Sequence, residues 1–417
     1  MADILFLAHR IPFPPDRGDK IRSWHVLRTI AGFARVHLAC FADDDADAAH
    51  LAGMEQALGD SLGDVHVEVR NRSKAAAAVR ALVSRRPLSL TSFDSHAMRD
   101  FVRARLGSMD AVYAFSGQMA QFVPAGAAPR FVMDFVDMDS AKFAAYAQEA
   151  SGPMRLIHAR EAKRLFAFER DVAARADACL FVSEAEAGLF RRRTGLPRVK
   201  SLANGIDAVF FDPAAPFPPL SPEERGEGPL LLFTGQMDYR PNVDAVCWFA
   251  REVLPLVPSA RFVIAGRNPA REVRALAGER VTVAGAVADM RSWLAAADVV
   301  VAPLRIARGI QNKVLEAMAM ARPVVASPAA FEGIEAEPGK HLLVTEGAEA
   351  MAEAISTLIA DPALATRLGR AGRDLVTTAY QWESRLAPLR DMLLPRVEPA
   401  GEQVPAEPVP ILAAVGP

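Results

Sequence analysis

Short continuous runs of apolar residues recur along the chain, and each is followed by a loop and then by residues with helical periodicity. Residues 4–8 form the first run, and a proline-rich loop separates it from a helix expected over 19–31. The second half opens in the same way, with an apolar run at 230–234, a glycine-containing loop and a helix that Asn242 or Asp244 can cap. Continuous apolar runs are typical of strands buried on both faces, and their alternation with helices predicts parallel sheets.

The same patterns place the remaining elements. Further strands are expected at residues 35–42, 110–115, 130–135, 178–182, 261–266, 281–287, 299–304, 322–327 and 341–344. Helices are expected within 43–64 and over 154–175, 347–360 and 363–378. Ser183, followed three residues later by Glu186, predicts a capping box at the start of another helix.

Turn signals and composition divide the chain. Asn204-Gly205 is a turn signal, so residues 1–205 are expected to form a first Rossmann-like domain. Residues 206–229, rich in proline and acidic residues, read as a linker, and 230–378 as a second Rossmann-like domain. A last helix is expected over 379–395, and a disordered tail over 396–417, where proline and alanine are frequent and charge is sparse.

The charges around residue 313 are unusual for the start of a helix. Lys313 lies in the first turn of a predicted helix, and Arg308 lies in the loop before it. Cations there oppose the helix dipole unless an anion is bound, and a phosphate would make them favourable. Glu316 is on the same helix face as Lys313, one turn further in, where a carboxylate suits ribose hydroxyls. The alternative is a surface Lys313–Glu316 pair with a solvated arginine.

This stretch resembles the nucleotide-sugar site of retaining glycosyltransferases of family 4, which have the two-domain α/β fold called GT-B. Glu316 is followed by Ala317-Met318-Ala319 and, further on, by Pro323-Val324-Val325, as in that family. The family's other glutamate, eight positions earlier, is replaced by Arg308. The sequence Met237-Asp238-Tyr239-Arg240-Pro241-Asn242 is similar to a sugar transferase subgroup found with bacterial exopolysaccharide and PEP-CTERM systems.

The resemblance implies a GT-B protein with two Rossmann-like domains facing across a cleft and a C-terminal helix that crosses back to the first domain. It implies transfer from a nucleoside diphosphate sugar, a UDP- or GDP-sugar, to a glycan or polyprenyl-linked acceptor, with retention of configuration and without cofactor or metal. The implied catalytic residues are Lys313, Glu316 and Arg308. The donor side would comprise Gly235, Gln236, Arg240, Asn242, Gly266, Arg267, Val287, Gly309, Ile310, Gln311, Lys313 and Glu316.

Two positions depart from the family pattern, and one loop has two interpretations. Gln236 and Asn242 stand where many family members have an arginine and a lysine on the diphosphate. Lys313 therefore becomes the main candidate for a phosphate ligand, with Arg240 as a second cation that could compensate. The resemblance also implies that the first loop of the chain borders the cleft near acceptor and diphosphate. Its candidates are Arg17, Gly18, Lys20 and His25, with Asp137 from a later loop. The alternative is a solvated loop whose cations pair with Asp16 and Asp19.

Composition limits the other functions. The net charge of −2 argues against general nucleic-acid binding. Residues 70–86 carry six basic residues and no acid, so this segment could touch an anionic membrane or could be an ordinary solvated helix. The three cysteines fit neither a metal site nor a disulfide framework. No apolar run approaches the ~20 residues of a membrane helix, and the start of the sequence does not resemble a secretory signal. We therefore expect a cytoplasmic protein, which could also bind peripherally to the inner face of the cell membrane.

Two alternatives to a glycosyltransferase stay open. A GT-B nucleotide-sugar epimerase would need acid–base carboxylates and histidines gathered in the cleft, and the sequence shows no such cluster. A non-catalytic nucleotide-sugar-binding protein would account for the replaced glutamate at 308 and the missing cations at 236 and 242. It predicts donor binding without turnover. The triplet Asp137-Met138-Asp139 imitates a metal-binding D-x-D motif, but we interpret it as cleft-edge or helix-capping residues.

Overall fold

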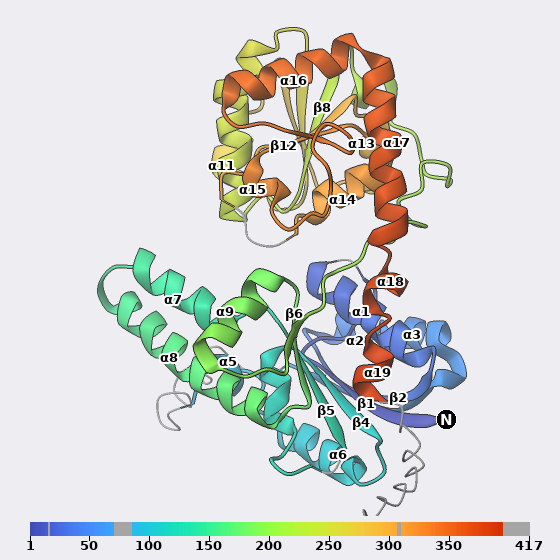
Figure 1. Ribbon diagram of the computed structural model, residues 1–417, viewed down its shortest axis with the longest axis vertical. Coiled ribbons are helices and arrows are strands. Elements are labelled where there is room, and N and C mark those ends of the chain that lie inside the picture. The colour runs from blue at the N-terminus through green and yellow to red at the C-terminus, as the bar shows by residue number, and fades with distance from the viewer. Residues whose placement is uncertain (16, 71–85, 128, 307–309, 395–417) are drawn as a thin grey trace, which may run out of the picture.

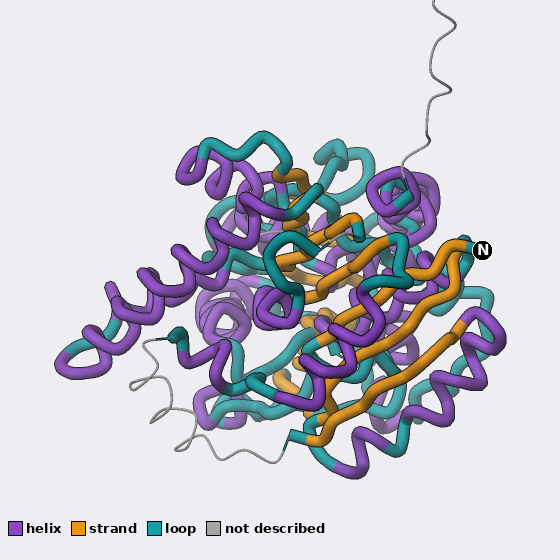
Figure 2. The backbone as a smooth tube through the Cα atoms, turned by 90° about the horizontal axis from the view of Figure 1, so that it is seen from below, coloured by secondary structure: helices purple, strands orange, loops and turns teal. Residues whose placement is uncertain are grey.

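The computed structural model describes residues 1–15, 17–70, 86–127, 129–306 and 310–394. Figure 1 shows two α/β domains, each a parallel sheet with helices on both faces. In the first sheet the strand order is β3-β2-β1-β4-β5-β6-β7, and in the second it is β10-β9-β8-β11-β12-β13. Figure 2 shows the same elements from below, and the strands of the first domain lie side by side in it.

The first domain takes its layers from the alternation of strands and helices. Its strands are β1 Ala2–Ala8, β2 Ala34–Ala42, β3 Leu62–Val69, β4 Ala111–Phe115, β5 Arg130–Val136, β6 Ala178–Phe181 and β7 Val199–Ser201. Its helices are α1 Gly18–Ala31, α2 Asp45–Ala48, α3 Leu51–Leu58, η1 Gly59–Ser61, α5 Leu88–Thr91, α6 His96–Leu106, η2 Gly117–Phe122, α7 Asp139–Glu149, α8 Gly152–Arg175 and α9 Glu184–Thr194. Along β1, Ile4 and Phe6 join one hydrophobic core and Leu5 and Leu7 the other, so both sheet faces are covered.

The second domain repeats this plan around one hydrophobic core. Its strands are β8 Leu230–Thr234, β9 Arg261–Ala265, β10 Val281–Gly285, β11 Val299–Ala302, β12 Val324–Ala326 and β13 Leu343–Val344. Its helical elements, with α10 of the linker, are α10 Pro222–Arg225, α11 Arg240–Trp248, η3 Phe249–Val253, η4 Leu254–Leu256, α12 Arg271–Arg274, α13 Met290–Ala296, α14 Asn312–Ala319, α15 Pro328–Phe331, α16 Ala348–Ala360 and α17 Pro362–Ala379. The inner strands β8, β9, β11 and β12 are almost fully buried, as continuous apolar runs predict, whereas the edge strands β10 and β13 are not.

The chain end returns to the first domain as expected, but as two short helices rather than one. After α17 come α18 Trp382–Leu386 and α19 Leu389–Leu393, which Figure 1 shows lying along the first domain. The ring of Trp382 stacks on His25 of α1 with centroids 4.5 Å apart, and Ile206 N donates to Tyr380 O at 2.6 Å. The Asn204-Gly205 turn is close-packed here, because a Cβ on Gly205 would lie 2.6 Å from the Trp382 backbone. The crossing is therefore fixed by packing at the domain junction.

Several local expectations are wrong. Residues 62–69, partly assigned to a helical segment, form β3, and 199–201 form β7. The expected long helix is preceded by α7 and pairs with it as a hairpin that turns at Gly152, whose φ of 59° favours glycine. The predicted capping box is half present: Ser183 accepts from Glu186 N at 3.2 Å, whereas the Glu186 carboxylate accepts from Met138 N at 3.3 Å.

The helix starts at the glycine loops also differ from the prediction. Helix α1 begins at Gly18 after Arg17, and α11 begins at Arg240 after Tyr239. Helix α14 begins at Asn312, so the preceding Gln311 occupies the cap position. None of the three caps uses a side-chain hydrogen bond in the described structure. Asn242 and Asp244, expected to cap α11, contact Lys313 and Arg305 instead.

Candidate functional site

The second sheet has its topological switch point between β8 and β11, the two central neighbours whose chain connections run in opposite directions. In open α/β sheets, ligands bind outside the carboxyl ends of the strands at such a point. The loop after β8 contains Gly235 and Gln236, the loop after β9 begins with Gly266, and α14 follows β11 with Lys313 in its first turn. The structure thus brings the predicted donor-side residues of three separate loops to one edge of the sheet.

Gly235 and Gly266 allow two backbone loops to touch at this edge. Their φ angles are 149° and 154°, which L side chains rarely adopt. A Cβ on Gly266 would lie 1.5 Å from Gly235 O, which is an impossible contact. A Cβ on Gly235 would lie 2.8 Å from Asn242 Nδ2 and 3.2 Å from Lys313 Nζ. The missing side chains therefore leave the space in which Lys313 and Asn242 meet the backbone.

The Lys313 ammonium is held by one amide and one aromatic ring. Its Nζ donates to Asn242 Oδ1 at 2.6 Å and lies 4.2 Å from the centroid of the Phe233 ring. Asn242 is itself 6% exposed, and its Nδ2 donates to Gln236 O at 2.9 Å. Within the described residues no carboxylate lies within 4 Å of Nζ. This is a fixed cation without a paired anion, the arrangement that a phosphate group would complete.

Glu316 lies one turn after Lys313 and is desolvated with it. Burial raises the pKa of Glu316 to about 7, and the nearby ammonium of Lys313 opposes that shift. Burial lowers the pKa of Lys313 to about 7, and Glu316 opposes that shift in turn. Two groups whose charge is this easily changed can respond to a charged ligand. A bound anion would favour the charged form of Lys313.

The other predicted donor-side residues lie in several different surroundings. Ile310 lines a cavity of about 380 Å³ between the domains, and Gln311 caps α14. Arg240 begins α11, while Arg267 contributes its carbonyl to Met237 N at 2.8 Å. Val287 follows β10 and packs against the second domain's core. Arg308 and Gly309 lie outside the described residues, so their predicted roles stay predictions.

The cavity between the domains joins three parts of the chain. Ser183 and Ala203 line it from the first domain, Ile310 and Gly333 from the second, and Arg385 from α18. Arg385 also forms an ion pair with Glu335 at 3.6 Å. Because Ile310 directly precedes Gln311 and α14, this cavity adjoins the start of the helix that carries Lys313. The donor-side loops therefore open toward the first domain.

The first domain has a second cavity, of about 530 Å³, at the corresponding switch point between β1 and β4. Its polar lining follows the carboxyl ends of β1, β4 and β5 and includes His9, Arg10, Ser116, Asp137 and Asp139. Four phenylalanine rings complete it, at 93, 115, 135 and 143. Aromatic faces beside mixed hydrogen-bond donors and acceptors suit a sugar, which has apolar ring faces and a rim of hydroxyls.

Backbone strain and one unpartnered buried nitrogen are found at this cavity. Ser116 and Val136, both in its lining, have φ of 74° and 68°, and a positive φ at a β-branched residue such as Val136 is rare. His9 Nδ1 is buried without a partner in the described structure. Burial raises the pKa of both Asp137 and Asp139. A hydroxyl-bearing ligand could supply the missing partner of His9 Nδ1.

The predicted loop residues are spread over different surroundings. Arg17 Nη2 donates to Asp43 Oδ2 at 2.9 Å and Arg17 Nε lies 3.3 Å from Asp19 Oδ1, which is close to the alternative interpretation of a paired loop. Lys20 is 4% exposed, and its Nζ donates to Asp47 Oδ1 at 2.5 Å, away from the cavity lining. His25 packs on Trp382, and Gly18 begins α1. Of the five, the structure places Asp137 in a cavity wall.

The residues that sequence reasoning missed are His9, Arg10, Phe115 and Ser116. They lie at or just after the carboxyl ends of the buried strands β1 and β4. That position was the available signal, because the carboxyl ends of neighbouring parallel strands meet at one edge. His9 stacks on Phe115 with centroids 5.8 Å apart, and its Nε2 lies 3.3 Å from Asp19 Oδ2. Arg10 lies between Asp19 and Asp43, at 2.7 and 3.1 Å.

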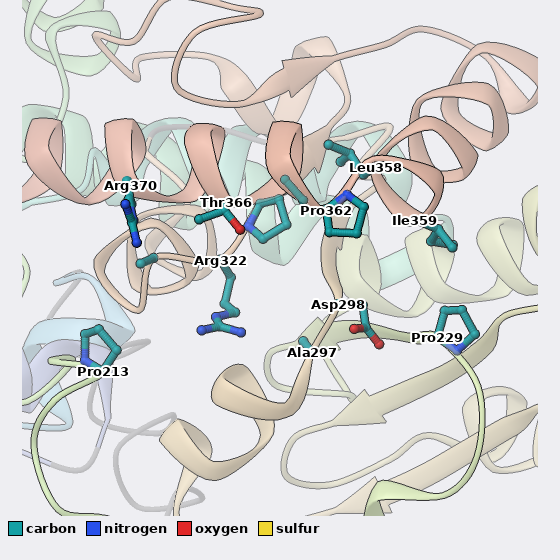
Figure 3. Close-up of a pocket in the computed structure, with 13 residues that line it drawn as sticks. Pro213, Pro229, Ala297, Asp298, Arg322, Leu358, Ile359, Pro362, Thr366 and Arg370 are labelled. Atoms are coloured by element: carbon teal, nitrogen blue, oxygen red, sulfur yellow. The ribbon is translucent and has the colours of Figure 1, made fainter.

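Another cavity, of about 460 Å³, lies at the opposite edge of the second sheet. Figure 3 shows Pro229, Asp298 and Arg322 facing residues of α16 and α17. Pro229 and Asp298 directly precede β8 and β11, so this cavity is at the amino ends of the strands. Neither Lys313 nor Glu316 lines it. We therefore do not assign the donor to it.

Two further features of the described residues bear on chemistry. Among them, no three His, Cys, Asp or Glu side chains are gathered in a way that could hold a metal ion. Asp137 and Asp139 belong to the wall of the first-domain cavity, where Gln118 Nε2 donates to Asp139 Oδ2 at 3.3 Å.

Among the described residues, none of the helices combines the length and the apolar character that crossing a bilayer requires.

Comparison with known proteins finds one family match and several similar sugar transferases. Residues 228–361 match the family described as Glycosyl transferases group 1. A GDP-mannose-dependent alpha-(1-6)-phosphatidylinositol monomannoside mannosyltransferase of Mycobacterium tuberculosis is 29% identical over 236 residues, which cover 52% of this chain and 61% of that protein. An alpha-D-kanosaminyltransferase of Streptomyces kanamyceticus is 28% identical over 227 residues, 51% of this chain and 58% of that protein. The chain thus spans about three fifths of the length of these relatives.

Solved structures match over nearly the whole chain. Anabaena Alr3699/HepE, solved in complex with UDP, has a TM-score of 0.63 at 17% identity and covers 94% of this chain and 99% of its own. A sucrose-phosphate synthase from Thermosynechococcus elongatus has a TM-score of 0.65 at 17% identity, with 94% and 98% covered. At such identities the likeness concerns the fold. The chain therefore has the α/β GT-B fold, with a glycosyl transferases group 1 match in its second domain.

Proposed function

We propose that this protein is a retaining glycosyltransferase of family 4 that moves a sugar from a nucleoside diphosphate sugar to a hydroxyl of a glycan or lipid-linked acceptor. The proposal depends chiefly on Lys313, a fixed and desolvated ammonium at the start of α14 with no carboxylate partner among the described residues. The match of residues 228–361 to group 1 glycosyl transferases supports it. A role in exopolysaccharide synthesis is part of the proposal and derives from the resemblance of residues 237–242.

The chemical problem in sugar transfer is the departing diphosphate. Negative charge builds on its oxygens while the sugar becomes oxocarbenium-like, so preorganised positive potential lowers the barrier. The Lys313 ammonium and the free N–H groups of the first turn of α14 would supply that potential. Glu316 would accept hydrogen bonds from the ribose hydroxyls. In the retaining mechanism that we propose, a leaving phosphate oxygen takes the proton of the attacking hydroxyl.

The acceptor would enter from the first domain. The cavity lined by His9, Asp137 and Asp139 lies at the carboxyl edge of the first sheet, and its aromatic and polar lining suits a sugar ring. We place the terminal sugar of the acceptor there, with Asp137 or Asp139 oriented toward its hydroxyls. Closure of the two domains would bring that hydroxyl to the donor and exclude water.

The test of the proposed function is calorimetric titration of the full chain with UDP, GDP, ADP and CMP, first with Mg²⁺ and then with EDTA. We expect UDP or GDP to bind, and EDTA to leave the affinity unchanged. Binding that requires the metal would direct attention back to Asp137 and Asp139. Absence of binding by all four would contradict the proposal. Binding without any transfer to sugar or lipid-linked acceptors would favour a non-catalytic nucleotide-sugar-binding protein.

Nucleotide affinity is expected to fall as the pH rises from 7 to 9. The pKa of Lys313 is lowered to about 7 in the free protein, and a bound diphosphate would raise it. Above pH 7 the lysine must therefore take up a proton on binding, which costs up to about tenfold in affinity per pH unit. Titrations of a UDP- or GDP-sugar in buffers with different ionisation enthalpies would count that proton. In Lys313→Met the pH dependence should disappear together with most of the affinity, and an unchanged slope would assign the titration to another group.

A further inference from the structure

The α7–α8 hairpin projects from the first domain, as the views in Figures 1 and 2 both show. Its two helices pack on each other, and Phe143, Tyr146 and His158 form an aromatic cluster between them. Tyr146 of this cluster is 42% exposed, and beyond the cluster Met154 is 49% exposed, Leu156 74% and Ile157 50%. These four residues, which we call the hairpin tip, are among the largest exposed apolar side chains of the described structure.

The residues around the hairpin tip are basic. Between positions 142 and 168 the sequence has five cations, Lys142, Arg155, Arg160, Lys163 and Arg164, and two carboxylates, Glu149 and Glu161. Glu161 is 3% exposed and points inward, where it accepts from the backbone N–H groups of Leu88 and Ser89 at 2.8 and 2.9 Å. Arg155 and Lys163 are exposed. The outward surface of this part of α8 is therefore apolar at its end and positive behind it.

We propose that the hairpin tip inserts into the interface of an anionic lipid bilayer. Apolar side chains of interfacial helices reach about 5–10 Å into the headgroup and acyl boundary, and basic side chains beside them attract anionic headgroups. Leu156 and Lys163 are seven residues apart, or about 10 Å along the helix at 1.5 Å per residue. When the tip enters the acyl boundary, Lys163 is then at the level of the headgroups.

A bilayer fits the hairpin tip better than a second copy of the chain. In a two-fold dimer the same patch would meet itself, so Arg155 and Lys163 of the two copies would face one another. The tip is the convex end of a projecting hairpin, and an anionic lipid surface offers both the apolar depth and the countercharge that it needs. The other segment that could touch a membrane, 70–86, lies mostly outside the described residues. Its ends, Arg70 and Arg86, are engaged with Asp43 and Gln121.

Membrane docking through the tip would also set the position of the acceptor cavity. Helix α7 begins at Asp139, and Asp139, Lys142 and Phe143 line the first-domain cavity. Tyr146 of the tip follows on the same helix, about 10 Å from Asp139. A lipid-linked acceptor in the same bilayer would therefore have its headgroup near the cavity. This consequence rests on the proposed function, whereas the membrane contact itself does not.

The experiment is co-sedimentation of the full chain with vesicles of phosphatidylcholine alone and of phosphatidylcholine with phosphatidylglycerol. We expect binding to the mixed vesicles that weakens with added salt. Leu156→Asp with Ile157→Asp should lower the partition coefficient at least ~tenfold. Arg155→Glu with Lys163→Glu should lower the partition coefficient for the mixed vesicles at least ~tenfold and should abolish the preference for anionic over neutral vesicles. Leu256→Asp is the matched control, because Leu256 is a 49% exposed leucine in the second domain; it should bind like the unmodified chain.

Circular dichroism and UDP or GDP titration of each variant would show that the fold and the nucleotide site are intact. A chain that binds no vesicle, or a tip variant that binds as well as the unmodified chain, overturns the proposal. A dimer that the tip variant abolishes, in a chain without vesicle binding, would overturn it in favour of a second copy. Because vesicle binding needs no nucleotide and nucleotide binding needs no vesicle, failure of either proposal is seen separately.

Discussion

Replacing Lys313 with alanine is expected to lower kcat/KM for sugar transfer at least ~100-fold, or about 3 kcal/mol of transition-state stabilisation. The ammonium is fixed by Asn242 Oδ1 at 2.6 Å and by the Phe233 ring, so it is preorganised for a diphosphate oxygen. Gln236 and Asn242 occupy the positions at which the resembled family has cations, which leaves more of the diphosphate charge to Lys313. Steady-state rates with a UDP- or GDP-sugar, together with calorimetric affinity for the diphosphate, would measure the loss.

Lys340→Ala is the matched control, because Lys340 is a lysine of the same domain whose side chain is 60% exposed and paired with Glu337. Its loss should leave transfer within about twofold, since an exposed ion pair contributes ~1 kcal/mol or less. Asn242→Ala should give an intermediate loss of about tenfold, because the ammonium would lose its fixed position but keep its charge. Near-normal transfer by Lys313→Ala would contradict the placement of the diphosphate at the start of α14.

The central strands, which are buried on both faces, were predictable, whereas the two strands that the prediction missed, β3 and β7, are the edges of the first sheet. The runs at 4–8 and 230–234 are continuous and apolar, and the structure places both as central strands. Strand β3 is an edge strand whose residues are half-buried, and its sequence, Leu-Gly-Asp-Val-His-Val-Glu-Val, mixes polar and apolar residues. Ser151-Gly152-Pro153 was a signal for the turn between α7 and α8, since Gly152 adopts a positive φ and Pro153 suits a first helical turn.

The candidate site was predictable to the extent that one segment contains its chemistry. Lys313 and Glu316 share a helix face, so their spacing alone brings them together. Lys20 and His25 depend on contacts that sequence spacing cannot show: Lys20 pairs with Asp47, 27 positions away, and His25 stacks on Trp382 at the other end of the chain. The first-domain cavity needs three strands to be ordered as neighbours before His9, Ser116 and Asp137 can be seen as one group.

Gly266→Ala is expected to weaken binding of UDP or GDP at least ~100-fold and to destabilise the second domain by roughly 3 kcal/mol. The new methyl group would lie 1.5 Å from Gly235 O, and the φ of 154° is strained for any L side chain. Neither neighbour is the flexible end of a side chain, so the loops after β8 and β9 must separate. That movement would displace the Gly235 backbone that lies next to the Lys313 ammonium. Thermal melting and calorimetric titration would measure the two effects.

Two further glycine variants separate the packing effect from the loss of the site. Gly278→Ala, in the same domain, should be nearly neutral in both measurements, because its Cβ would meet only Leu276 O at 3.9 Å. Gly235→Ala shares the φ strain, since φ is 149° there, but its Cβ would meet the Asn242 amide and the Lys313 ammonium, at 2.8 and 3.2 Å, which are side-chain ends rather than backbone. We therefore expect Gly235→Ala to melt closer to the unmodified chain than Gly266→Ala and yet to bind the nucleotide weakly. Strong nucleotide binding by Gly235→Ala would mean that the donor does not depend on the space between Gly235 and Lys313, and the site would have to be sought in the cavity between the domains.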